Sequence, residues 1–181
     1  MTRLTVFDLE QPVRRLSDTE DAHDIERTLG AIGIRYERWT APATLAPDAG
    51  ETLVLRTYQV EVDRLKAECG YQAADVVRLR RGVENAAALR AKFLDEHIHD
   101  EDEVRFFVEG RGAFYLRSDR GVHRVICERG DLLGVPAGTR HWFDMGANPE
   151  FTAIRLFTNP EGWVARFTGD PVANTVPAID G

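Results

Sequence analysis

The stretch FLDEHIHDEDEVRFFVEGRG, residues 93–112, places two of the chain's five histidines inside a run of acidic residues. In an extended chain successive side chains alternate, so His97 and His99 face the same way, roughly 6–7 Å apart. Glu103 would lie roughly 13 Å beyond His99 in a straight strand. We therefore expect a turn across residues 100–102 and a new strand from Glu103. Imidazoles and a carboxylate gathered in this way suit a transition metal.

A second stretch, GDLLGVPAGTRH at residues 130–141, supplies a fourth ligand. Proline and glycine shape a tight turn there, and the histidine opens the following strand. The two stretches resemble the paired motifs of the cupin superfamily in order, spacing and glycines. The matching residues are His97, His99, Glu103 and Gly110 in the first motif and Gly130, Pro136, Gly138 and His141 in the second. Met145 stands where many cupins have asparagine, which is not a ligand.

A closer resemblance covers residues 87–170. The segments KFLDEHIHDEDEVRFFVEGRGAFYL, VPAGTRHWFDMG, FTAIRLF and NPEGWVARFTGD are similar to the acireductone dioxygenase family of methionine salvage, and HWFDMG with its methionine is a feature of that family. The resemblance implies that His97, His99, Glu103 and His141 bind one Fe²⁺ or Ni²⁺ per chain. From the chemistry of the ligands alone, three imidazoles and one carboxylate equally suit Mn, Co or Zn and exclude calcium.

The reaction that the resemblance implies is cleavage of acireductone, 1,2-dihydroxy-3-keto-5-methylthiopentene, by O2. An Fe²⁺ form would give 4-methylthio-2-oxobutanoate and formate. A Ni²⁺ form would give 3-methylthiopropanoate, formate and carbon monoxide. A metal with two open positions would chelate the substrate through adjacent oxygens.

Further site residues follow partly from spacing and partly from the resemblance. Arg105 shares the side of Glu103 on a continuous strand, and its guanidinium fork suits an oxyanion substrate. Phe107, Phe143 and Trp163 would form an apolar wall for the thioether chain, the last by resemblance alone. The resemblance also links Glu96 and Asp102 with metal loading and with relaying local structural changes. His23 and His123 are interpreted as surface or satisfied residues.

Around the motifs the sequence predicts a mainly β fold, a cupin-type antiparallel β-barrel or jelly roll with N-terminal helices packed outside. One cupin domain would span residues 1–181, with a helical half at about 1–92 and a metal-binding core at about 93–168. Expected elements before the core are strands near 5–7 and 34–39, a helix after a capping box at 17–20, a helix at 51–68 and a short helix at 85–92. The tail, 169–181, is expected to be extended or mobile.

Composition narrows the class of protein. A net charge of −7 argues against nucleic-acid binding, which needs clustered basic residues. The start of the chain lacks the apolar region of a signal peptide, and no apolar run approaches the roughly 20 residues of a membrane span. Cys69 and Cys127 lack CxxC spacing and are expected to stay reduced. A cytoplasmic protein is expected, and the family resemblance suggests a monomer.

Two alternatives remain open from the sequence. Another cupin metalloenzyme, such as a thiol or flavonol dioxygenase or an isomerase, would share the four ligands but need not keep Arg105 or HWFDMG. A cupin that only binds or senses a small ligand often loses a metal ligand, and this chain has lost none.

Overall fold

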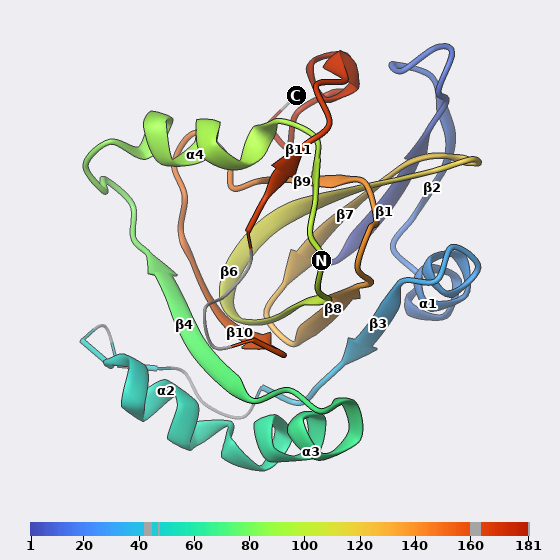
Figure 1. Ribbon diagram of the computed structural model, residues 1–181. Helices are drawn as coiled ribbons and strands as arrows, with labels where there is room; N and C mark the ends of the chain where they lie inside the picture. The colour runs from blue at the N-terminus through green and yellow to red at the C-terminus, as the bar shows by residue number, and fades with distance from the viewer. Residues whose placement is uncertain (42–44, 47, 160–163, 181) are drawn as a thin grey trace.

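The computed structural model describes residues 1–41, 45–46, 48–159 and 164–180, and its ribbon is drawn in Figure 1. None of the helices described in these ranges combines the length and apolar character needed to cross a bilayer. The strands are β1 (Arg3–Phe7), β2 (Arg15–Thr19), β3 (Arg35–Arg38), β4 (Ala73–Leu79), β5 (His97–Ile98), β6 (Glu103–Ser118), β7 (Gly121–Glu128), β8 (Asp131–Val135), β9 (His141–Asp144), β10 (Phe151–Phe157) and β11 (Arg166–Phe167). The helices are α1 (Ala22–Gly30), α2 (Glu51–Thr57), α3 (Gln59–Cys69), α4 (Ala86–Leu94) and the 3₁₀ helix η1 (Pro171–Asn174).

The long strand β6 belongs to two antiparallel sheets at once. One sheet runs β11-β5-β9-β6-β7-β1-β2, and the other runs β4-β10-β6-β8-β3. The first half of β6 pairs with β8 and β10, and its second half pairs with β7 and β9. Figure 1 shows β6 curving strongly between them. The predicted cupin-type antiparallel fold is confirmed, although the hydrogen-bonded path traced through the described strands stays open rather than closing into a ring.

A β-bulge in β6 sets which side chains face the space between the sheets. Thr152 on β10 pairs with Glu109, but Ala153 pairs with Phe107, so Val108 is the extra residue. A bulge reverses the alternation beyond it. Before the bulge Phe107 faces the inner core while Val108 faces outward; after it, even-numbered side chains such as Phe114 face inward. The start of β6 therefore delivers odd-numbered residues, Glu103 and Arg105 among them, to the interior.

Helices and the tail cover the outer faces of the two sheets. The outer face of the β10–β6 sheet packs on Val54 of α2 and on Tyr58, Val62 and Leu65 at and within α3, which agrees with helices placed outside. The outer face of the other sheet packs on Val172 and Val176 of the tail, among others. The tail thus contains a 3₁₀ helix and lies on the sheet, which differs from the extended or mobile segment expected.

The first half of the chain holds more strand than the sequence predicts. The capping-box interpretation of residues 17–20 is wrong: these residues lie in and just after β2, and Asp21 caps α1 by accepting from the amide of Asp24. The expected helix at 51–68 is two helices that meet at Tyr58. Residues 73–79, for which the sequence predicts no strand, form β4 by pairing with β10 over its whole length, a long-range contact rather than a local one.

Gly110, a glycine of the first motif, is required by a close backbone approach. Its φ is +68°, and a Cβ there would lie 1.9 Å from the carbonyl oxygen of Glu150. We expect Gly110→Ala to lower the free energy of unfolding by more than about 2 kcal/mol, from left-handed strain and overpacking together. Gly82→Ala is the control, because Gly82 has φ +78° but open space around it. Urea unfolding that shows equal losses for both variants would refute the steric part.

His123 is buried on β7, with the same inward parity as Val125 and Cys127, so it is not a surface residue. Burial lowers its pKa from the ordinary 6.5. The unfolded chain therefore takes up a proton at His123 below pH 6.5 while the folded chain does not, and stability is lost as the pH falls through that window. We expect His123→Gln to flatten this loss, by up to about 1 kcal/mol between pH 6.5 and 5.5. Urea titrations of metal-free parent and variant at both pH values measure the difference.

Candidate metal centre

The three motif histidines meet where β5 runs beside β9. Strand β5 has only two residues, and its His97 pairs directly with His141, the first residue of β9. The chain then turns across residues 100–102, and β6 begins at Glu103 opposite Val135 of β8. The turn and the new strand expected from the spacing are therefore present. Two hydrogen bonds donated by main-chain amides join the motifs. The amide of Gly138 donates to the carbonyl of His99 (2.9 Å), and the amide of Ala137 donates to Asp102 Oδ1 (2.9 Å).

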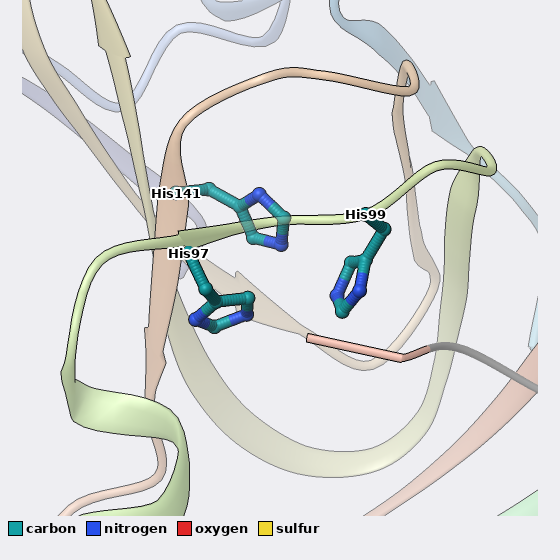
Figure 2. Close-up of side chains that lie close together, drawn as sticks. All are labelled: His97, His99 and His141. Carbon is teal, nitrogen blue, oxygen red and sulfur yellow. The ribbon is translucent and has the colours of Figure 1, made fainter. Parts of the chain in front are cut away.

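The imidazoles of His97, His99 and His141 turn toward one another (Figure 2). One ring nitrogen from each lies within 4.8 Å of the others, and the ring centroids are 4.6–5.1 Å apart. All three side chains are buried. No other group of three or more histidine, cysteine or acidic side chains with this proximity occurs among the residues that the structure describes.

Backbone carbonyls set the tautomer of each histidine. Nδ1 of His97, His99 and His141 lies 2.7, 3.0 and 2.7 Å from the carbonyl oxygens of Asp95, Val164 and Thr139. A carbonyl can only accept, so each Nδ1 carries the proton and each Nε2 presents a lone pair. Sequence reasoning missed these acceptors because a main-chain oxygen leaves no signature in residue type.

The carboxylate of Glu103 adds a further acceptor to the cluster. Its Oε2 lies 3.0 Å from Nε2 of His141 and 3.3 Å from Nε2 of His99, and the side chain is buried. Three imidazole lone pairs and a carboxylate oxygen thus converge, which is unfavourable unless a cation lies among them. The residues therefore fit a divalent metal held by three neutral imidazoles and one carboxylate.

The pKa directions show which of these groups are in a form that can bind a metal. Burial is the largest influence on His97 and lowers its pKa to about 4, so it stays neutral and able to bind a metal. Burial would also lower the pKa of His99, but its contact with Glu103 raises it overall. Burial would raise the pKa of Glu103, yet the charge of Arg105 and the neighbouring histidines hold it well below its usual range. Glu103 is an anion, as a ligand must be.

Arg105 lies beside the cluster, as the spacing predicts. Its Nε is 2.8 Å from Oε1 of Glu103, and its guanidinium carbon lies 4.4 Å from the centre of the Phe143 ring. The side chain is buried, and burial lowers its pKa from the ordinary 12.5. Even a lowered guanidinium pKa leaves the group cationic near neutral pH. Arg105 therefore supplies a fixed positive charge at the edge of the cluster.

The other predicted site residues are placed less directly. Phe107 and Phe143 are core side chains with ring centres 6.4 Å apart. The carboxylate of Glu96 contacts Arg117 and Thr168, and the carboxylate of Asp102 accepts from the amide of Ala137. Trp163 lies outside the described residues.

The acidic turn is more than a solvated loop. Besides Asp102, which fastens the proline turn, Glu101 accepts from the hydroxyl of Thr158 (2.6 Å) and the amide of Asn159 (3.1 Å). Asp100 pairs with Arg166 of β11. The three carboxylates thus connect three different segments around the metal centre.

Comparison with known proteins places this site in a family. The family model described as the ARD/ARD' family matches residues 3–165. Acireductone dioxygenase of Parvibaculum lavamentivorans is 55% identical over 180 residues, covering 99% of this chain and 98% of that protein. The protein of the same name from Yersinia enterocolitica is 53% identical over 180 residues, covering 99% and 100%.

A solved structure agrees with the sequence relatives. Acireductone dioxygenase from Bacillus anthracis, described with a cadmium ion in its active centre, superposes with a TM-score of 0.79 at 29% identity, covering 92% of this chain and 98% of that one. The match covers most of the chain, well beyond the two motifs alone. The chain belongs to the ARD/ARD' family, the acireductone dioxygenases.

Proposed function

We propose that His97, His99, Glu103 and His141 bind a single Fe²⁺ or Ni²⁺, and that the chain uses it to cleave acireductone with O2. Metal-dependent dioxygenase activity accords with the family, its curated relatives and the metal-containing neighbour. The choice of Fe²⁺ or Ni²⁺, the ligand set and the roles of individual residues are the proposal. Its main support is the convergence of three Nε2 lone pairs and one buried carboxylate.

When bound, the metal would supply Lewis acidity and a template for a chelating enediolate. The protein contributes the rest. Backbone carbonyls keep the histidine lone pairs directed inward, and the buried surroundings exclude water. Arg105 would stabilise negative charge that grows on the substrate, because its cation is fixed in place before reaction. Phe107, Phe143 and Trp163 are proposed to contact the thioether tail, while Glu96 and Asp102 are proposed to act by holding segments in position.

The same proposal covers the assembly and its setting. The four proposed ligands come from one chain, so a monomer provides a full ligand set, and we propose that it is the functional unit. Cys69 and Cys127 are free thiols, which suits a reducing compartment and supports a cytoplasmic location. Small molecules, acireductone and O2, are the proposed partners.

The test is to reconstitute metal-free protein separately with Fe²⁺ and Ni²⁺ and to analyse metal content and products. We expect one metal per chain and O2-dependent loss of acireductone. The Fe²⁺ form should give 4-methylthio-2-oxobutanoate and formate, and the Ni²⁺ form 3-methylthiopropanoate, formate and carbon monoxide. Turnover of cysteine or quercetin instead would favour another cupin dioxygenase, and ligand binding without turnover by any metal form would favour a binding protein.

A further inference from the structure

The carbonyl that sets the tautomer of His99 belongs to a short segment at the edge of a sheet. This segment, residues 164–170, is called the strap. It contains the two-residue strand β11, which among the described strands pairs with β5 alone, through Arg166 opposite Ile98 and Phe167 opposite His97. Its Val164 carbonyl accepts from Nδ1 of His99 at 3.0 Å. The orientation of a proposed metal ligand thus depends on where the strap lies.

The strand pairing is too short to hold the strap firmly by itself. A two-residue ladder gives few hydrogen bonds, and edge segments open readily. The ion pair between Arg166 and Asp100 joins two largely exposed side chains and contributes little. Two further contacts of the strap are made at buried Glu96: Thr168 donates to its carbonyl through the amide (3.0 Å) and to its carboxylate through the hydroxyl (2.8 Å).

Arg117 ties these contacts to the central strand. It projects from β6, on the far side of β9 from β5 in the sheet order. Its Nη1 lies 3.1 Å from Oε2 of Glu96 and 2.6 Å from Oδ2 of Asp170, at the end of the strap. The Glu96 side chain is fully buried, so its contact with Arg117 is shielded from solvent. The guanidinium of Arg117 therefore binds both Asp170 of the strap and Glu96, the residue before β5.

We propose that Arg117 is a positioning residue of the metal centre. By pairing with Glu96 and Asp170 it holds the strap on β5, so that the Val164 carbonyl keeps the proton of His99 on Nδ1 and leaves Nε2 facing the cluster. The inference rests on the proposed ligand set. It assigns Arg117 no contact with metal or substrate. It gives Glu96 a specific role as the buried partner that binds Arg117.

The variants are chosen to separate the two ion pairs of Arg117 from other contacts nearby. Arg117→Met removes both ion pairs. Asp170→Asn removes the charge that pairs with Arg117 at the end of the strap. It keeps an N-cap for η1, whose first turn Asp170 caps through Oδ1 in the parent protein. Asp180→Asn is the matched control. Asp180 lies in the same C-terminal tail and pairs with Arg90 of α4, outside the strap.

Two measurements read the result without enzyme turnover. Long-range ¹H–¹⁵N NMR spectra of the metal-free proteins report the tautomer of each histidine, and Ni²⁺ titration reports affinity. We expect Arg117→Met to place His99 in a mixture of tautomers and to weaken Ni²⁺ binding about tenfold or more, as loss of groups that orient metal ligands does. Asp170→Asn should act in the same direction to a smaller extent, and Asp180→Asn should leave both readouts unchanged.

The other two histidines distinguish positioning from general loosening. His97 and His141 donate to Asp95 and Thr139, which lie outside the strap, so their tautomers should not change. Unchanged Ni²⁺ affinity and an unchanged His99 tautomer in folded Arg117→Met would overturn the inference. If that variant does not fold, Asp170→Asn and Thr168→Val decide by the same criteria. Failure of the parent protein to bind Ni²⁺ would instead reject the proposed metal centre itself.

Discussion

Replacing His141 with alanine is expected to abolish metal retention and cleavage of acireductone together. His141 is the proposed ligand from the second motif, and its Nε2 lies 3.0 Å from the Glu103 carboxylate. Its loss leaves ligands from only one segment, the short run from His97 to Glu103. Changes to groups that merely orient ligands already weaken metal binding 10–100-fold, so removing a ligand should weaken it by more than about 100-fold. Metal analysis after gel filtration and O2 uptake with acireductone measure the two losses.

The matched control is His23→Ala. His23 is exposed on α1 and has no place in the cluster, so the variant should keep metal and activity. Cavity formation at buried His141 will also lower stability, so circular dichroism must show a folded variant before the losses are compared. Full activity in folded, metal-free His141→Ala protein would remove the metal from the proposed reaction.

The metal motifs could be recognised from sequence because their geometry is local. Alternation fixes His97 and His99 on one face of a short extended segment, and the distance to Glu103 demands the turn that the structure shows. The contribution of His141 depends on a long-range strand pairing, which the residues alone could not supply and the family resemblance did. The face of β6 on which Arg105 lies could be predicted, because Arg105 is two residues after Glu103 and both precede the bulge that changes the alternation of side chains.

What the sequence could not predict depends on partners distant along the chain. Strand β4 forms on the edge of β10, and the tail packs on the outer face of β6 and β9. The roles of Val164 and Thr139 belong to main-chain oxygens, which any residue offers. Arg117 resembled many other surface arginines until the fold placed Glu96 and Asp170 beside it. Non-local pairing and burial decide each of these features.

The second large effect is expected from Arg105→Met, and it should depend on whether metal is bound. Without metal, Arg105 is the cation 2.8 Å from the buried Glu103 carboxylate. Removing one partner of a buried ion pair costs about 3–5 kcal/mol, because the remaining charge is left uncompensated. A bound divalent ion would itself neutralise Glu103, so the metal-bound variant should lose much less stability. Urea unfolding of both forms measures the difference.

Catalysis should respond differently from stability. Arg105→Met should retain one metal per chain but lower kcat by about 10²–10³-fold, the effect of losing a preorganised group that stabilises developing charge. Arg105→Lys is the control for charge: it should recover much of the metal-free stability but less of kcat, because an ammonium lacks the planar fork of the guanidinium that lies over Phe143. Unchanged kcat/KM in Arg105→Met would remove this residue from the mechanism.

Glu103→Gln provides the final control, because it removes the charge that Arg105 compensates while keeping the shape of the side chain. If the charge of Glu103 causes the instability of metal-free Arg105→Met, adding Glu103→Gln should restore much of the lost stability, and the two changes should be strongly non-additive. Unlike Arg105→Met, the double variant should fail to hold metal, since it lacks the carboxylate of the proposed ligand Glu103. Additive losses in the metal-free protein would instead show that Arg105 stabilises the fold by packing on Phe143 and Phe114.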